Sequence, residues 1–176
     1  MIAKKLKKGS VVGIIAPSNP ITGDRRFLLD NAVKKFETLG LKVVFSENCF
    51  KTDKYDVSGG EPEERARDLN DMFADESVNA IYCAHGGDTA NQVLPLIDFD
   101  NIKKHPKIFL GMSDVDVLHL SIYAKTGLVV FNGSDPKSGR GLDFDFEYTW
   151  NSFQERMFLA SKDIPASSER KCVRGG

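Results

Sequence analysis

The segment Lys107-Ile-Phe-Leu-Gly-Met-Ser-Asp-Val-Asp-Val-Leu118 decides how the rest of this sequence is interpreted. A short apolar run leads into Gly111, Ser113 follows, and a helical pattern begins at once. Glycine has no Cβ and permits a close turn, and the first N–H groups of the following helix point toward whatever lies beside the serine. Such N–H groups stabilise the negative charge that develops on a carbonyl group under attack. Ser113 is therefore the candidate nucleophile.

The same segment also has a simpler interpretation. The nucleophile turn of the α/β-hydrolases reads G-x-S-x-G, whereas Val115 stands at the second glycine position here. Serine and aspartate are common at helix N-caps, so Ser113 or Asp114 could merely cap the helix that follows. On this local pattern alone capping is the more frequent outcome, because a single short motif has a high false-positive rate.

Composition and charge exclude several classes of protein. A chain of 176 residues with 41% hydrophobic content can bury a full core in one domain. Its net charge of −1 predicts neither a nucleic-acid nor a membrane partner, and no apolar stretch reaches the length of a transmembrane helix. Cys49, Cys83 and Cys172 are scattered, which argues against a disulfide framework or a zinc site and indicates a reduced, cytoplasmic protein without a metal site.

Short apolar runs alternate with amphipathic segments along the chain. The runs predict strands at residues 10–16, 41–45, 78–84, 108–110 and 128–131. The amphipathic segments predict helices at residues 25–39, 61–73, 89–96, 115–125 and 146–159. This alternation predicts an α/β fold with a mainly parallel sheet flanked by helices, a three-layer sandwich of the flavodoxin-like or glutamine-amidotransferase-like type.

In such sheets, ligands bind outside the carboxyl ends of the strands. Polar and glycine residues collect at these predicted ends, in the segments 17–19, 46–60, 85–88, 112–114 and 132–133. Glycine pairs there are often only turns; the functional interpretation is that Gly86 or Gly87 supplies a backbone N–H beside Ser113. Neither a G-x-G-x-x-G fingerprint nor a phosphate-binding G-x-x-x-x-G-K loop follows any strand, which disfavours a nicotinamide or nucleoside-triphosphate enzyme.

Three other side chains have both a chemical and a structural interpretation. His85 precedes the glycine pair and could face the same pocket, although a structural role is the more common one and base assignment needs geometry first. Cys83 lies near a strand end, where class I glutamine amidotransferases place a cysteine nucleophile, but buried cysteine usually packs as a small hydrophobe. His119 lies six positions after Ser113, which on a helix points it away from the serine.

Seven motifs along the chain occur in the order and at the distances found in one known family. They are Lys8–Ser18, Glu64–Leu69, Ile81–Gly87, Leu94–Phe99, Pro106–Asp114, Lys125–Leu128 and Phe131–Gly133. With them the chain resembles the serine peptidases of the LD-carboxypeptidase and microcin C immunity protein type. The segment Gly86-Gly-Asp-Thr-Ala-Asn91 resembles the immunity branch of that family more than the murein branch.

The resemblance implies a two-domain hydrolase with a Ser-Glu-His triad and neither a metal nor an organic cofactor. Ser113 would be the nucleophile, and the oxyanion hole would use the amide of Asp114 and that of Gly86 or Gly87. The substrate would be a murein tetrapeptide cut next to a D-amino acid, or a peptidyl- or aminoacyl-nucleotide conjugate. The resemblance also implies a cytoplasmic enzyme. A homodimer is the oligomeric state that it suggests, and pairing of chains through apolar surface that a further domain would cover is the alternative.

The glutamate and histidine of the triad map to no position of this sequence. The resemblance places them in a C-terminal domain, so residues 1–160 are expected to form the nucleophile-bearing N-terminal domain and residues 161–176 to begin a linker to that further domain. A serine without its base is a poor nucleophile, and these 176 residues alone are therefore expected to be inactive. The alternative is a non-catalytic module that binds a carboxylate or phosphate at the helix N-terminus beside Ser113.

Overall fold

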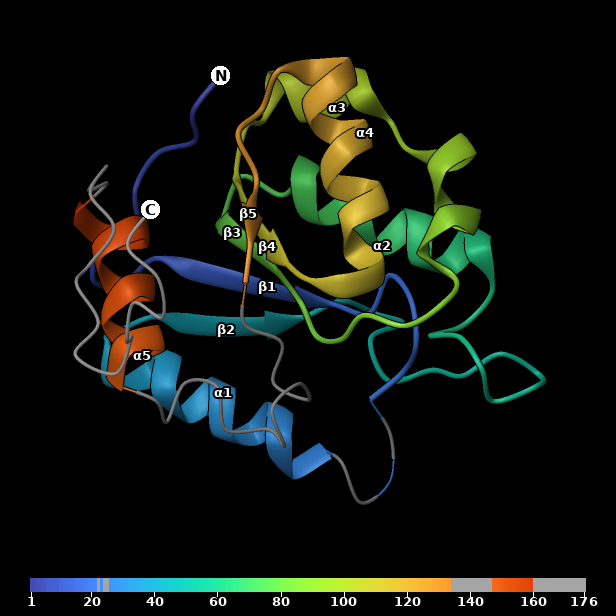
Figure 1. Cartoon of the computed structure of the whole chain (residues 1–176), viewed down its shortest axis with the longest axis horizontal. Helices are drawn as coiled ribbons and strands as arrows, with labels where there is room; N and C mark the ends of the chain where they lie inside the picture. Colours follow the sequence, from blue (N-terminus) through green and yellow to red (C-terminus); the bar gives the residue numbers. More distant parts are fainter. Residues whose placement is uncertain (22, 24–25, 134–146, 160–176) are drawn as a thin grey trace, which may run out of the picture.

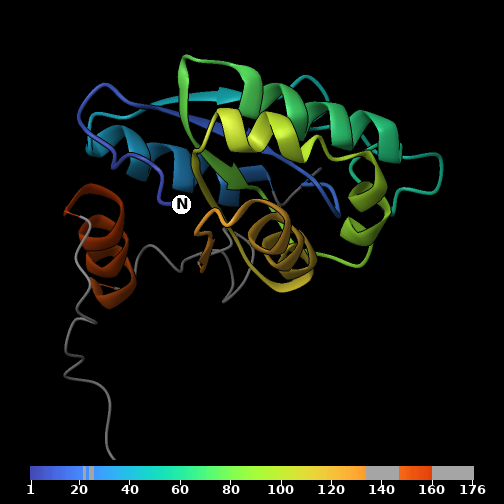
Figure 2. The same cartoon turned by 90° about the horizontal axis from the view of Figure 1, so that it is seen from above.

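A computed structural model describes residues 1–21, 23, 26–133 and 147–159 and shows a three-layer α/β arrangement (Figure 1). The strands are β1 (Val11–Ile15), β2 (Lys42–Phe45), β3 (Val78–Cys83), β4 (Ile108–Gly111) and β5 (Phe131–Asn132), all parallel, in the order β2-β1-β3-β4-β5. Helices α1 (Arg26–Thr38) and α5 (Glu147–Gln154) lie on one side of the sheet, and α2 (Pro62–Ala74), α3 (Phe99–Lys104) and α4 (Asp116–Thr126) lie on the other (Figure 2). The predicted fold class is confirmed.

Both faces of the central strands are apolar and buried, which explains why these strands appear in the sequence as short continuous apolar runs. Alternate residues serve the two layers. The α1 face of the sheet packs Ile14, Tyr82 and Leu110 against Leu29, Phe36 and Phe153. The α2 face packs Ile15, Ile81 and Phe109 against Leu69, Phe73 and Leu118. Each fully buried side chain of this size contributes about 1.5–3 kcal/mol to folding, so burial fixes which face each residue serves.

Most predicted elements are present, and the exceptions have local causes. Residues 89–96 form a 3₁₀ segment, η2 (Ala90–Leu96), rather than an α-helix, and it contains Pro95, which has no N–H to donate. Helix α3 was not predicted; its N-cap, Asp98, accepts a hydrogen bond from the Asn101 N–H at 2.9 Å. Strand β5 begins later than predicted, because the Val129 N–H donates to the carbonyl of Met1 at 2.8 Å instead of pairing with β4.

At the other end of the described chain, α5 continues into a π-helical turn, η6 (Glu155–Leu159). The predicted helix at residues 146–159 is thus present over 147–159. The expected linker at 161–176, which includes Cys172, lies outside the described residues.

The strand order creates a reversal point in the sheet. The chain proceeds from β1 to β2 in one direction and then returns to add β3, β4 and β5 on the other side of β1. In sheets of this order, the crevice outside the carboxyl ends of the two strands at the reversal, here β1 and β3, is the usual ligand site. The carboxyl end of β4, which leads into Ser113, lies next to it.

Candidate active site

Ser113 begins a strained turn between β4 and α4. Its φ angle is +63°, and Asp56, with φ of +56°, is the other non-glycine residue with positive φ in the described ranges. Aspartate tolerates the left-handed region better than serine does, and such a conformation costs of order 1–3 kcal/mol. A short 3₁₀ turn, η3 (Ser113–Val115), leads from the serine into α4. The serine side chain is exposed, so the strained turn presents its hydroxyl to the surface.

Gly86 lies directly against this turn. A Cβ atom at position 86 would lie 2.9 Å from the Cβ of Ser113 and 3.0 Å from the carbonyl oxygen of Met112. Gly111, at the end of β4, is equally confined, because a Cβ there would lie 2.7 Å from Cγ1 of Val115. Real Cβ atoms essentially never approach so closely. The serine turn and the loop after β3 can therefore pack together only because both carry glycine.

Gly87 faces the end of β1 rather than the serine. Its φ is +148°, and a Cβ there would lie 2.2 Å from Cγ of Asn19 and 2.6 Å from Oγ of Ser18. The Asn19 N–H donates to the Gly86 carbonyl at 3.1 Å, and the Asp88 N–H donates to Oδ1 of Asn19 at 3.2 Å. Of the two predicted glycines, Gly86 is thus the one that the structure brings against Ser113, and Gly87 joins the glycine loop to β1.

The carboxylate of Asp114 joins three strand ends. Its Oδ2 accepts hydrogen bonds from the Ser18 hydroxyl at 2.5 Å and from the Ala90 N–H at 2.7 Å. The Ser18 oxygen in turn accepts from the Thr89 N–H at 3.2 Å. The N-caps of η3 and α4 are Met112 and Val115, and neither makes a side-chain cap hydrogen bond. The capping interpretation of Ser113 and Asp114 is therefore wrong, since Asp114 bonds the first turn of η2 instead.

Two of the other candidate side chains lie in the core. Cys83 is 1% exposed and packs with the α2 layer, as the hydrophobic interpretation predicted. His119 is 5% exposed, and its Nδ1 lies 2.9 Å from Oδ1 of Asp116. Its Nε2 is buried and has no hydrogen-bond partner within the described part of the chain. Burial lowers the pKa of His119 despite the opposing effect of Asp116, and the ring packs edge-on against Phe109 in the core. His85 is partly exposed beside the glycine loop.

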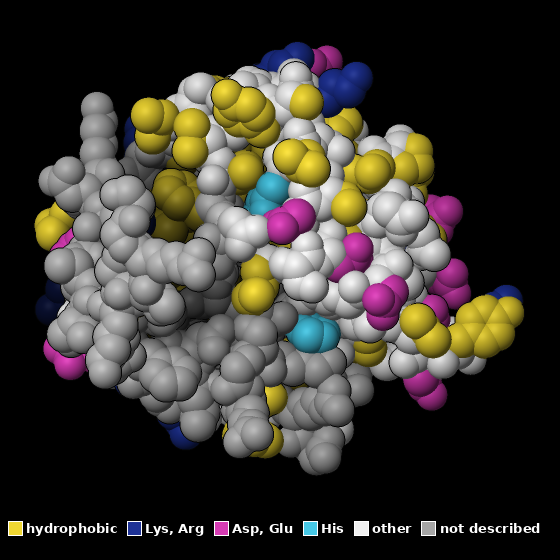
Figure 3. All heavy atoms as spheres, in the orientation of Figure 1, with side chains coloured by type: hydrophobic (Ala, Val, Ile, Leu, Met, Phe, Trp, Pro, Cys, Tyr) yellow, Lys and Arg dark blue, Asp and Glu magenta, His cyan; other side chains and the backbone are white. Residues whose placement is uncertain are grey.

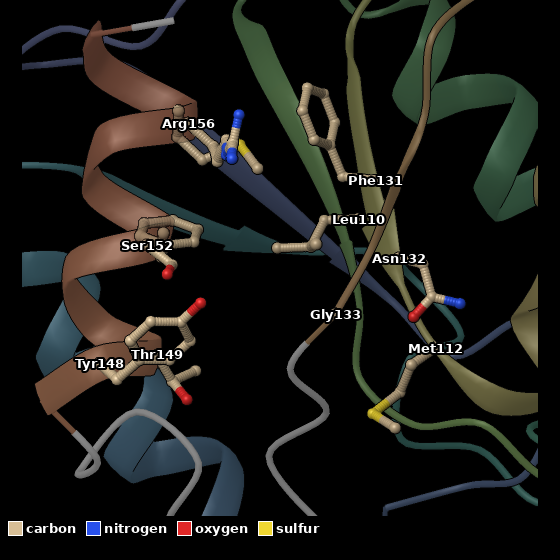
Figure 4. Close-up of a pocket in the computed structure, with 11 residues that line it drawn as sticks. Leu110, Met112, Phe131, Asn132, Gly133, Tyr148, Thr149, Ser152 and Arg156 are labelled. Carbon is tan, nitrogen blue, oxygen red and sulfur yellow. The ribbon is translucent and has the colours of Figure 1, made fainter. Parts of the chain in front are cut away.

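A cavity of about 420 Å³ adjoins the serine turn between the ends of β4 and β5 and helix α5 (Figure 4). Figure 4 shows apolar side chains of the sheet facing polar groups of α5 across it. Its lining comprises Leu110, Met112, Phe131, Asn132, Gly133, Tyr148, Thr149, Ser152, Phe153, Arg156 and Met157. The amide of Asn132 donates to Oδ1 of Asp116 at 2.6 Å and so ties the end of β5 to the first turn of α4.

Sequence reasoning missed the side chains that support this site. Ser18 and Asn132 were noted only as parts of polar strand ends, and Arg65 only as part of a motif. A signal for Arg65 was present, because it falls on the same face of α2 as the buried Leu69 and Met72. In the ranges that the structure describes, no group of three His, Cys, Asp or Glu side chains is placed to hold a metal ion. No helix in those ranges is long and apolar enough to cross a membrane.

Known proteins match this chain over most of its length. Residues 12–133 match the family model of the LD-carboxypeptidase N-terminal domain. A probable murein peptide carboxypeptidase of Bacillus subtilis is 38% identical over 183 residues, which cover 98% of this chain and 56% of that protein. The microcin C7 self-immunity protein MccF of Escherichia coli is 35% identical over 133 residues, which cover 76% of this chain and 38% of the relative.

Solved structures agree with these matches. MccF in complex with glutamyl sulfamoyl guanosine superposes with a TM-score of 0.80 at 30% identity, covering 89% of this chain and 46% of that one. An MccF-like protein from Bacillus anthracis gives a TM-score of 0.79 at 35% identity and covers 90% and 47%. The chain thus spans about half the length of the Bacillus subtilis relative and of these two solved structures. It belongs to the LD-carboxypeptidase family and corresponds to the N-terminal domain of that family.

Proposed function

We propose that this chain is the nucleophile-bearing domain of a serine carboxypeptidase that hydrolyses an amide bond in a small peptide or peptidyl-nucleotide substrate. Ser113 attacks the carbonyl carbon, the amide bond breaks after the tetrahedral intermediate collapses, and water then releases the acyl group. The relatives support this substrate class by their names, since one is a probable murein peptide carboxypeptidase and another is a microcin immunity protein. The enzyme is cytoplasmic and uses no metal or organic cofactor.

The observation that carries the proposal is the strained conformation of Ser113. A serine held at φ of +63° and pressed against Gly86 gains nothing for stability from that geometry, because the left-handed region is unfavourable for serine. The same geometry is useful in catalysis, because a strained turn of this kind exposes the nucleophile's oxygen, and backbone amides at such a turn stabilise the charge that develops on the attacked carbonyl group. The amides of Asp114 and Gly86 form the oxyanion hole in this proposal, with Gly87 holding the loop in place.

The cavity beside the serine turn supports a small organic substrate. It reaches the nucleophile through Met112, which immediately precedes Ser113, and combines an apolar floor with the polar groups of α5. Mostly apolar pockets with a few convergent polar groups are typical of small-molecule sites. We assign to this cavity a side chain or ring of the substrate that lies next to the scissile bond.

Ser113 requires a general base from elsewhere in the protein. Among the described residues its hydroxyl has no hydrogen-bond partner, and the neighbouring carboxylate of Asp114 is already engaged by Ser18 and Ala90. A serine hydroxyl is weakly nucleophilic until a base takes its proton. In our proposal a glutamate and a histidine from chain beyond residue 176 complete the triad, and the 176 residues alone are inactive.

The test is amide hydrolysis by the complete gene product that contains this chain, with Ser113→Ala as control. We expect release of D-alanine from a murein tetrapeptide, or cleavage of an aminoacyl-sulfamoyl or peptidyl-nucleotide conjugate, and a loss of at least about 10³-fold in kcat in the variant. Full activity of Ser113→Ala would contradict the proposal. Light scattering on the same preparation checks the expected homodimer.

A second function is compatible with the Ser113 hydroxyl having no hydrogen-bond partner among the described residues. If the complete product cuts neither substrate class, the polar turn at Ser113 fits a module that binds a carboxylate or phosphate at the start of η3 and α4. Calorimetric titration with acetyl-D-alanine and with adenosine monophosphate separates the two functions, because only a binding module would hold these ligands while leaving both substrates intact.

A further inference from the structure

Arg65 is a buried cation behind the glycine loop. It lies on α2, is 1% exposed, and donates hydrogen bonds to four residues in three segments of the chain. Its Nε donates to the Gly60 carbonyl at 3.1 Å, Nη1 donates to the carbonyls of Pro17 and Thr89, each at 2.9 Å, and Nη2 donates to Oε1 of Gln92 at 2.6 Å. One planar group thus connects the loops that follow β1, β2 and β3.

The partners of Arg65 are uncharged. In the described part of the chain, no carboxylate lies within ion-pair distance of the guanidinium, and its acceptors are backbone carbonyls, the Thr89 hydroxyl at 3.3 Å and a side-chain amide. Burial lowers the pKa of Arg65, with more distant carboxylates opposing it. An apolar side chain would serve core packing at lower cost. What arginine adds is a rigid fork of five donors that fixes several acceptors at once.

Three hydrogen bonds lead from Arg65 to the nucleophile turn. Arg65 holds the carbonyl of Thr89, the N–H of Thr89 donates to the Ser18 oxygen, and the Ser18 hydroxyl donates to the carboxylate of Asp114. A second path runs through Pro17, which precedes Ser18. Both paths end at the residue next to Ser113, and both pass beside Gly86 and Gly87.

We propose that Arg65 is a positioning residue for catalysis, which keeps the glycine loop and the Ser113 turn in the register that the oxyanion hole requires. This inference rests on the proposed function of Ser113. Arg65 does not touch the reacting atoms; it acts through Thr89, Ser18 and Asp114. A displacement of about 1 Å at a reacting centre can cost about 10²-fold in rate, so loss of Arg65 reduces kcat and leaves substrate binding in the α5 cavity largely intact.

Lys107 offers a matched control. It is the other Lys or Arg side chain that is buried in the described part of the chain, at 6% exposed, and its Nζ donates to a backbone carbonyl, that of Asp75. Burial lowers the pKa of its amine too. Lys107 precedes the amino end of β4, whereas Ser113 follows the carboxyl end of that strand. Lys107→Met therefore removes a buried, carbonyl-bound cation at the amino end of β4, away from Ser113.

The experiment measures kcat, KM and Tm of the complete gene product for Arg65→Ala, Arg65→Lys and Lys107→Met beside the parent and Ser113→Ala. We expect Arg65→Ala to lower kcat about 10²-fold with KM changed less than about threefold, Arg65→Lys to lower kcat less, and Lys107→Met to lower Tm while keeping kcat. Millimolar guanidinium ion is expected to restore part of the kcat of Arg65→Ala and none of that of Ser113→Ala.

Each outcome has one meaning. An unchanged kcat in Arg65→Ala, or equal losses of kcat in Arg65→Ala and Lys107→Met, overturns the positioning role and leaves the proposed function standing. Full activity of Ser113→Ala overturns both. If Arg65→Ala does not fold, Gln92→Leu, which removes one acceptor of the guanidinium, decides the matter: a kcat below that of Lys107→Met supports the role, and a kcat equal to that of the parent overturns it.

Discussion

The hydroxyl of Ser18 donates a hydrogen bond to the carboxylate of Asp114 across 96 positions of sequence, at 2.5 Å. The bond joins the carboxyl ends of β1 and β4, which are separated in the sheet by β3. Ser18 is fully buried, so its hydroxyl depends on this partner rather than on water. The carboxylate of Asp114 thus joins the segments that follow β1 and β4. In our proposal the backbone N–H of the same residue faces the substrate.

Replacing Asp114 tests whether its hydrogen bonds to Ser18 and Ala90 position the serine turn. Asp114→Ala leaves the Ser18 hydroxyl and the Ala90 N–H without an acceptor, and each unsatisfied buried group costs about 1–3 kcal/mol. We expect a lower free energy of unfolding by chemical denaturation and at least tenfold lower kcat, with Asp114→Asn intermediate, because one amide oxygen still accepts from Ala90. Asp88→Asn is the control, since Asp88 is exposed and its carboxylate makes one contact of 3.4 Å; equal effects at 88 and 114 would contradict the assignment.

Gly86→Ala addresses the contact between the glycine loop and the nucleophile. The added Cβ would lie 2.9 Å from the Cβ of Ser113 and 3.0 Å from the Met112 carbonyl oxygen, so the loop or the serine must shift. We expect kcat to fall about 10²-fold in the hydrolysis assay. Gly9→Ala serves as the comparison: its φ of +87° is strained for alanine, but its Cβ would meet nothing within 4 Å. It should lower stability by about 1 kcal/mol with kcat unchanged. Retention of kcat by Gly86→Ala would argue against an oxyanion role for this loop.

The buried ring of His119 predicts a pH dependence of stability. Its pKa in the folded protein lies below its ordinary value of 6.5 because burial disfavours the charged ring. The unfolded chain therefore binds the proton more tightly. The stability that the neutral ring contributes is complete above pH 6.5, is lost as the pH falls toward the folded-state pKa, and changes by at most about 1.4 kcal/mol per pH unit.

The measurement is denaturant unfolding between pH 5 and pH 8 for the parent and for His119→Asn, whose amide can still donate to Asp116. Subtracting the two curves removes the contribution of every other titrating group that the two proteins share. We expect the parent's advantage to shrink steadily below pH 6.5. A difference that is flat across this range would show that His119 titrates alike in the folded and unfolded states.

Filling the α5 cavity should weaken substrate binding. Ser152 lines the cavity, whereas the adjacent Asn151 is exposed. Ser152→Phe is expected to raise KM at least about tenfold with a smaller effect on kcat, on the scale by which a pocket discriminates among substrates of different size. Asn151→Phe adds the same ring to the same helix outside the cavity and should leave KM unchanged. Equal KM values for both variants would place the substrate elsewhere.

Apolar side chains also gather over α4 at the top of the view in Figure 3. Leu120 and Tyr123 on that helix are 71% and 59% exposed. They lie three positions apart, on one side of α4. If the expected homodimer uses this face, Leu120→Lys will shift the mass measured by light scattering toward the monomer, whereas Lys125→Ala at the end of the same helix will not. A dimer that is unaffected by Leu120→Lys must use another surface.

The sequence predicts the sheet well because burial on both faces leaves a strong local pattern. Apolar runs such as Val78–Cys83 differ clearly from the amphipathic α1 and α2. It predicts short elements poorly: α3 has six residues and β5 has two, too few for periodicity to separate them from loops. The start of β5 depends on a bond between Val129 and Met1, which no local pattern encodes.

In the candidate site, too, residues with a local sequence signal could be found, and residues that act through long-range contacts could not. The placement of Ser113 and Gly86 could be predicted because each stands at a strand end, and strand ends are visible locally. Arg65 could not be assigned a role, because its acceptors at Pro17 and Thr89 come together only when β1 and β3 pair. The role of the Asp114 side chain was likewise hidden, since capping of the following helix and bonding to Ser18 leave the same local sequence.

The parallel sheet has a consequence for synthesis on the ribosome. Strand β1 lies between β2 and β3, so when β1 and β2 have emerged, one edge of β1 stays open until β3 follows. A nascent chain in this interval exposes the unpaired edge of an apolar strand, which is the kind of surface that chaperones bind and that aggregates at high concentration. The Ser18–Asp114 bond closes only after β4 has emerged as well. The proposed catalytic centre therefore forms late in synthesis, and a nascent chain that stalls before that point carries no assembled nucleophile turn.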